Sequence, residues 1–159
     1  MLEALADSPY ATFVRESLWG WPMSLTFHAF GVIGLSIIIM LRLLGFFGSI
    51  PYTSLSRLFP IIWISVVIQV LSGSSLWMTK PDKYVSDYAF DVKIAFVILG
   101  VIVTIYLQRM LAQEATVWQS TGKVPRRGVQ VSCATALAWM GVLEFGRLTA
   151  YLGQLYGVG

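Results

Sequence analysis

The sequence has 159 residues, of which 57% are hydrophobic and only 12% are charged, and its formal net charge is +3. A soluble domain carries about 25% charged residues, so this composition argues against a soluble protein and predicts an integral membrane protein. The basic residues form no dense run and most of them flank apolar segments, so nucleic-acid binding has no support.

The first twenty residues predict a short helix that lies in the membrane interface. Ser8 and Pro9 are typical of an N-cap followed by the first helical position, and several apolar side chains up to Leu18 can share one face. Trp19 to Pro22 then end this segment. The segment has three acidic residues against one arginine, so we expect it to be retained rather than cleaved as a signal peptide.

Four apolar stretches follow, and each is long enough to cross a hydrocarbon core of about 30 Å at about 1.5 Å per helical residue. No internal repeat divides the chain. The sequence therefore predicts an all-α fold with one domain over residues 1–159, an integral membrane four-helix bundle. The predicted spans cover residues 22–44, 58–78, 90–110 and 129–152, and the longest predicted loop covers residues 111–128.

Lysine and arginine near the span ends predict the orientation in the membrane. One side holds six of them, and the other side holds three basic residues beside five acidic ones. We expect the six-residue side to be cytoplasmic, which places both termini outside, or in the periplasm if the membrane is a bacterial inner membrane. The six are Arg42, Arg57, Arg109, Lys123, Arg126 and Arg127.

The fourth span carries two charged residues inside an apolar run. Glu144 and Arg147 are three positions apart, so a helix places them on one face, and Tyr151 lies one turn further along that face. Charges inside a membrane are costly and are kept when they are paired, face the bundle interior or serve a ligand.

Polar residues of the other spans fall at similar depths. Counted from the outer span ends at about 1.5 Å per residue, Lys93 and Arg147 lie roughly 5–8 Å deep, His28 about 9 Å, and Glu144 and Gln69 about 12–14 Å. One positive charge is left over in this layer, which invites a haem propionate, a lipid phosphate or a carboxylate substrate. Alternatively, Lys93 extends to the interface and Glu144–Arg147 is a pair that locks the helices.

His28 is the only histidine in the sequence and the candidate metal ligand. As a haem ligand it requires a five-coordinate iron, a methionine partner or His28 of a second subunit. Met23, Met78 and Met140 lie at outer or middle depth. Zinc or copper is not expected, because His28 and the single Cys133 lie at opposite depths. No catalytic constellation is present in the sequence.

The pattern His28-x-x-Gly31 followed by Leu41-Arg42-Leu43-Leu44-Gly45 resembles a family of small four-helix bacterial membrane proteins of unknown function. Lys93 matches that family's third-helix lysine, and Trp139, Gly146-Arg147 and Ala150-Tyr151 match its fourth-helix signature. More distantly, the layout is similar to four-helix haem proteins of the cytochrome b561 and copper-resistance (CopD) type. That resemblance implies b-type haem held by histidines, although this chain has one histidine.

Three functional hypotheses follow. In the first, the chain is an electron-transfer subunit with haem b as cofactor: His28 binds the iron, Lys93 and Arg147 hold the propionates, Glu144 orients Arg147, and Gln69 and Tyr151 complete the site. In the second, it is a non-catalytic accessory subunit or homo-oligomer among membrane lipids, packed through small-residue stripes such as Gly31/Gly34 and Gly141/Gly146. In the third, it is a transporter or proton-linked channel that uses Glu144.

Overall fold

A computed structural model describes the backbone of residues 20–79 and 88–155, and the side chains of residues 32–74 and 88–148. This part of the chain forms four α-helices, one short 3-10 helix and no strand, which confirms the all-α expectation. The helices are α3 (Gly20–Leu43), η1 (Tyr52–Leu58), α4 (Phe59–Thr79), α6 (Tyr88–Thr121) and α7 (Arg126–Leu155). The predicted interfacial helix lies outside the described residues.

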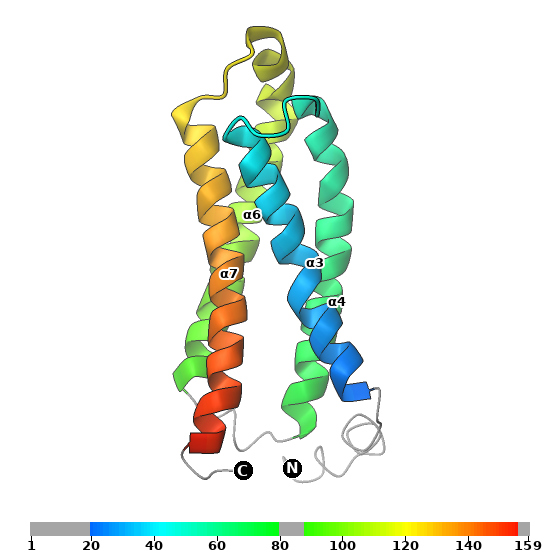
Figure 1. Ribbon diagram of the computed structural model, residues 1–159, viewed down its shortest axis with the longest axis vertical. Helices are drawn as coiled ribbons and strands as arrows, with labels where there is room; N and C mark the ends of the chain where they lie inside the picture. The colour runs from blue at the N-terminus through cyan, green and yellow to red at the C-terminus, as the bar shows by residue number, and fades with distance from the viewer. Residues whose placement is uncertain (1–19, 80–87, 156–159) are drawn as a thin grey trace.

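The four long helices alternate in direction along the long axis of the molecule (Figure 1). We call the end that holds η1 and the α6–α7 connection the loop end, and the opposite end, where α3 begins and α7 ends, the terminal end. α7 packs against both α6 and α3, and α3 packs against α4. α4 and α6 are not packed together along their length. The arrangement therefore leaves a seam between α4 and α6.

Three segments of the described chain are long and apolar enough to cross a membrane by length and composition: Tyr52–Ser74, Tyr88–Thr121 and Arg126–Leu148. In α3, which has 24 residues, the part with described side chains is a shorter apolar helix, Val32–Leu43. Large apolar side chains also face outward, among them Ile64 and Ile98. Helices that are apolar on their outer faces as well suit a membrane environment.

The third long helix extends beyond its predicted end. The predicted loop at residues 111–128 is wrong over its first part, because α6 continues to Thr121 and α7 begins at Arg126. Leu107, Leu111, Ala115 and Trp118 recur at helical spacing and are all buried. Polar composition suggested a loop, but these buried positions give the extension an apolar face that packs against η1.

Arg42 organises the loop end. Its side chain is only 5% exposed, and its guanidinium carbon lies 3.9 Å from the centre of the Tyr52 ring. Arg42 Nε also donates a hydrogen bond to the Ile50 carbonyl oxygen. Tyr52 in turn meets the Trp118 ring edge to face at 6.4 Å, and its backbone N–H donates to Gln119 Oε1 at 2.8 Å. These contacts join α3, η1 and the extension of α6.

Small residues let α6 and α7 approach each other closely. A Cβ on Gly100 would lie 3.0 Å from the Trp139 indole, and one on Gly141 would lie 2.5 Å from the Phe96 ring. The Phe96 ring stacks on that of Phe145 with 5.3 Å between centroids. The predicted role of Gly141 in helix packing thus has a partner within this chain. Gly34 has no atom within 4 Å of its Cβ position.

Candidate functional site: a cavity between α4 and α6

A cavity of about 420 Å³ lies in the seam between α4 and α6. Small-molecule and cofactor sites typically measure about 300–1,000 Å³, so this cavity can hold a ligand. Towards the loop end the seam is closed, because Trp63 Nε1 donates a hydrogen bond to Gln108 Oε1 at 2.8 Å. The cavity is lined by Val66, Gln69, Val70, Gly73, Ser74, Phe90, Lys93, Ile94, Val97 and Trp139.

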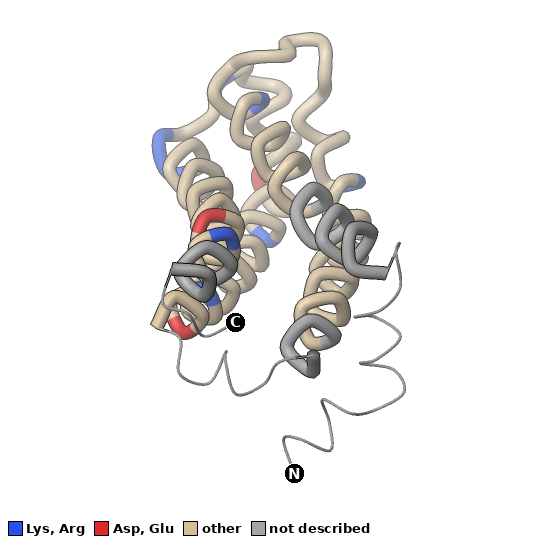
Figure 2. Tube along the Cα trace, turned by 60° about the horizontal axis from the view of Figure 1, so that its bottom comes forward, with Lys and Arg blue, Asp and Glu red and all other residues tan. Residues whose placement is uncertain are grey.

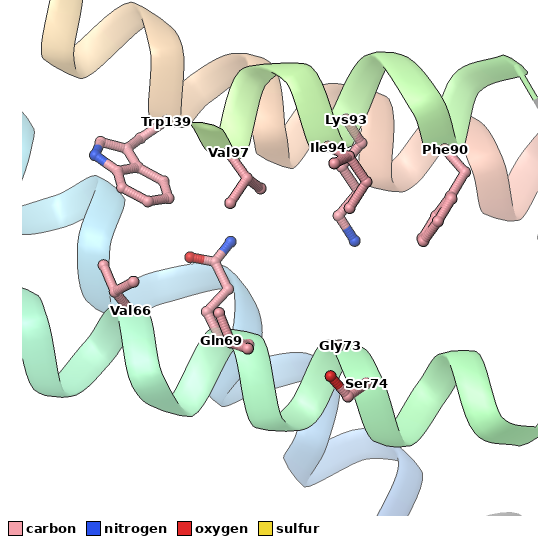
Figure 3. Close-up of a pocket in the computed structure, with 10 residues that line it drawn as sticks. Val66, Gln69, Gly73, Ser74, Phe90, Lys93, Ile94, Val97 and Trp139 are labelled. Atoms are coloured by element: carbon pink, nitrogen blue, oxygen red, sulfur yellow. The ribbon is translucent and has the colours of Figure 1, made fainter. Parts of the chain in front are cut away.

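Two of the lining residues bring strong polar groups into this apolar space. Lys93 from α6 and Gln69 from α4 both extend into the gap between the two helices (Figure 3). Gln69 is only 7% exposed, although it carries an amide. Its amide and the Lys93 ammonium therefore give the cavity hydrogen-bond donors beside a cationic centre.

The Lys93 side chain lies beside a glycine of α7. Lys93 Nζ lies 3.7 Å, and its Cε 3.6 Å, from the point where a Cβ on Gly146 would stand. The lysine side chain therefore runs along α7 at a residue that has no side chain of its own. Gly146 belongs to the sequence signature that resembled a known family, and here it provides the surface over which Lys93 lies.

An aromatic ring borders the cavity on each side of Lys93. Trp139 reaches it from α7; the residue is fully buried, and its indole N–H donates to the Thr104 hydroxyl at 3.0 Å. Thr104 donates in turn to the Gly100 carbonyl oxygen of its own helix at 2.6 Å. Phe90 extends towards α4 beyond Lys93, on the side away from Trp139 (Figure 3). The lysine thus lies between two aromatic boundaries.

The predicted site residues divide into three groups. Lys93 and Gln69 line one cavity. Glu144 and Arg147 lie on α7 with exposed side chains, do not line the cavity and, although both side chains are described, form no ion pair with each other. His28 lies in α3 and Tyr151 in α7, but their side chains are outside the described part.

Charged residues of α6 and α7 gather near the terminal end (Figure 2). Lys93 is placed beside α7 by its contact with Gly146, the residue that precedes Arg147. The exposed Arg147 and the half-buried Lys93 are therefore on adjacent helices at a similar level. Two acidic residues accompany these two basic ones, Asp91 in the first turn of α6 and Glu144 of α7, so charges of both signs lie near the cavity.

The described residues contain no group of three or more His, Cys, Asp or Glu side chains that could hold a metal ion. Among the residues with described side chains, the cavity lining supplies Lys93 for a propionate and no His, Met, Cys or Tyr as an iron ligand. The fit of a haem to this cavity consequently depends on His28, whose side chain is not described. Cys133 is a half-buried free thiol of α7 outside the cavity.

The sequence pattern did not indicate the residues that form the apolar walls of the cavity. Trp139 appeared only as part of a signature, and Phe90, Val97 and Gly73 were not singled out. In an apolar span, a cavity-lining valine has the same pattern as a lipid-facing one. The combination of Gly100 with a tryptophan on the facing helix was the available signal for the position of Trp139.

Comparison of the chain with protein-family models, with curated proteins and with solved structures finds no match. The function is therefore inferred from the cavity itself.

Proposed function

We propose that this chain is a membrane-embedded binding protein that holds an apolar, anionic molecule in the cavity between α4 and α6. One observation carries the proposal: a largely apolar cavity has the Lys93 ammonium and the Gln69 amide extending into it. An ammonium and an amide at an apolar wall attract a carboxylate or phosphate through charge-assisted hydrogen bonds. An anionic group on an apolar body therefore matches both the polar groups and the apolar walls of the cavity.

The proposed setting is a bacterial inner membrane with the four helices as a transmembrane bundle. The positive residues of the loop end support a cytoplasmic location for that end, and both termini are then periplasmic. The cavity belongs to the terminal half and therefore to the outer half of the bilayer. α6 has 34 residues, or about 51 Å of helix, so its extension beyond residue 110 projects from a core of about 30 Å on the cytoplasmic side.

Haem b is one candidate for the bound molecule, as the resemblance to cytochrome b561-type and CopD-type proteins implies. Its propionates are anionic, and Lys93 is placed to bind one of them. When bound, the haem would supply one-electron chemistry. The part of this chain would be to hold the propionate at Lys93 and Gln69 and to exclude water with the apolar walls of the cavity.

An accessory role in a larger or homo-oligomeric membrane complex is the second candidate. Gly34 supports it, because this glycine is exposed on α3 and no described neighbouring residue has an atom within 4 Å of its Cβ position. Small residues on an outer face let a helix of another subunit approach closely. Native mass spectrometry tests this role: an assembly larger than one chain supports it, and a strictly monomeric particle argues against it.

The binding function is tested by titrating the detergent-purified protein with hemin and, separately, with oleate. Both probes combine carboxylate and apolar parts. Val97→Trp places a large ring at the cavity wall, and Ile102→Trp places the same ring on the exposed face of α6 as a control. We expect at least one probe to bind wild type and the control, and Val97→Trp to weaken that binding at least tenfold. Binding of neither probe, or equal binding by all three proteins, contradicts the proposal.

A further inference from the structure

The cavity opens sideways, towards the surroundings of the helices. Val70 of α4 and Ile94 of α6 line the cavity, yet they are 53% and 41% exposed. Lining residues that are also exposed mark the position of the opening, and these two lie on the two helices that form the seam. In a membrane the faces around this opening are covered by acyl chains, because Ile98 and Leu71 beside them are exposed and apolar.

The cavity has a limited length. Trp139 packs at the level of Gly100, and Phe90 marks the other boundary. Ten residues of α6 separate these two levels, which corresponds to about 15 Å at a rise of about 1.5 Å per residue. Lys93 lies near the Phe90 boundary, so the remaining, apolar part of the cavity extends from the ammonium towards Trp139. This shape suits one chain with an acidic group at one end.

Burial of a hydrocarbon chain gives little selectivity in a membrane, because the lipid interior is already apolar. The discriminating interaction is therefore the charge-assisted hydrogen bond to Lys93. A neutral molecule with the same chain lacks the anionic partner of this bond and gains less from Lys93. A small hydrophilic anion cannot reach the ammonium through acyl chains.

We propose that the cavity takes up a single-chain fatty acid from the bilayer, which passes sideways through the seam between α4 and α6 and places its carboxylate on Lys93. This inference rests on the proposed binding function and names its ligand. The first part of the fatty-acid chain lies along Val97 and Val66 towards Trp139. The rest of the chain leaves through the opening between Val70 and Ile94 into the bilayer. Gln69, on the opposite wall, provides an amide N–H for the same carboxylate.

The test uses the full chain in phosphatidylcholine nanodiscs with stearate that carries a nitroxide near its carboxyl end, within the length of the cavity. Electron paramagnetic resonance measures the fraction of motionally restricted label. We expect a restricted fraction in wild type, Lys93→Arg and Ile102→Trp that unlabelled oleate displaces. Lys93→Gln should lower the affinity about tenfold, the typical worth of a charge-assisted hydrogen bond. Val97→Trp should remove the restricted fraction.

Two control ligands test the role of the carboxylate charge and the route of entry from the bilayer separately. The methyl ester of the same labelled stearate should behave in wild type as the acid does in Lys93→Gln. Succinate, which stays in water, should not displace the labelled acid. Equal restriction of acid and ester, or displacement by succinate, overturns the inference.

Failure of the fatty-acid proposal can be told apart from failure of the proposed binding function. Hemin binding without stearate binding overturns the fatty-acid ligand and leaves the binding function in place. Failure of both probes overturns both proposals. Oleate competition in wild type requires no variant, so a folding defect in Val97→Trp does not decide the result.

Discussion

Lys93 of α6 lies over Gly146 of α7, with its Nζ 3.7 Å from the position of a Cβ on that glycine. The contact holds the lysine between the neighbouring helix and the cavity. It also explains why a cation in the third helix and a glycine in the fourth belong to one site. The Lys93 ammonium is placed by packing on α7, while it extends towards α4.

Enlargement of residue 146 should therefore impair ligand binding. In Gly146→Leu the new side chain occupies the space of the Lys93 methylene groups, and we expect the affinity for oleate to fall about tenfold, as expected for Lys93→Gln. Gly146→Ala is the matched control, because its Cβ would meet Lys93 at an ordinary contact distance of 3.6 Å. Titration with oleate measures the affinity of both variants. Unchanged binding in Gly146→Leu would show that this contact does not position the lysine.

The packing of α6 against α7 should be sensitive at Gly141. A methyl group there would come within 2.5 Å of the Phe96 ring, so Gly141→Ala should destabilise the protein by about 1–3 kcal/mol through overpacking. Gly34→Ala, where no atom lies within 4 Å, should be neutral or stabilising by up to about 1 kcal/mol. Thermal unfolding in detergent compares the two. A larger loss of stability in Gly34→Ala than in Gly141→Ala would contradict this expectation and indicate that a partner packs against α3.

The loop end should depend on Arg42. Arg42→Met removes the stacking on Tyr52 and the hydrogen bond to the Ile50 carbonyl, so we expect a loss of about 2 kcal/mol. Arg42→Lys should restore only part of this stability, because an ammonium lacks the planar guanidinium. Arg57→Met, an exposed arginine of η1, should change stability by less than about 0.5 kcal/mol. Equal melting temperatures of Arg42→Met and wild type would show that Arg42 does not stabilise the loop end.

The haem prediction has a spectroscopic test of its own. If haem b is the ligand, the natively purified protein shows a Soret band, and His28→Ala shifts or removes this band because the iron loses its ligand. Lys93→Gln should lower haem retention while leaving the band position unchanged, since it affects a propionate. A wild-type preparation without a Soret band, or an unchanged band in His28→Ala, argues for a ligand other than haem.

Much of the fold was predictable because apolar length alone determines where a helix can cross a bilayer. The predicted starts and ends of the first, second and fourth spans lie within three residues of α3, α4 and α7. The end of the third was missed, because the segment is polar and has Lys123, Arg126 and Arg127 near its end, a composition typical of a loop. The buried Leu111, Ala115 and Trp118 on its other face could have indicated a helix.

The site was predictable only in part. Depth along the helix placed Lys93 and Gln69 in the same half of the membrane, but depth does not determine which way a side chain points. Glu144 and Arg147 have similar depths and lie on exposed faces of α7. Arg42 was counted for membrane orientation, whereas the structure buries it against Tyr52. Rotation of each helix about its axis depends on packing between helices, and the sequence pattern of an apolar span carries little information about it.

The central claim is that Lys93 holds an acidic, apolar molecule within the seam between α4 and α6. Native mass spectrometry of protein purified from membranes in mild detergent tests it most directly, with Lys93→Gln and the control Arg109→Gln, an exposed arginine of the same helix. The account predicts one small bound molecule on wild type and on Arg109→Gln, and a clearly lower occupancy of that molecule on Lys93→Gln. A bound molecule retained equally by Lys93→Gln, or absent from all three proteins, would contradict it.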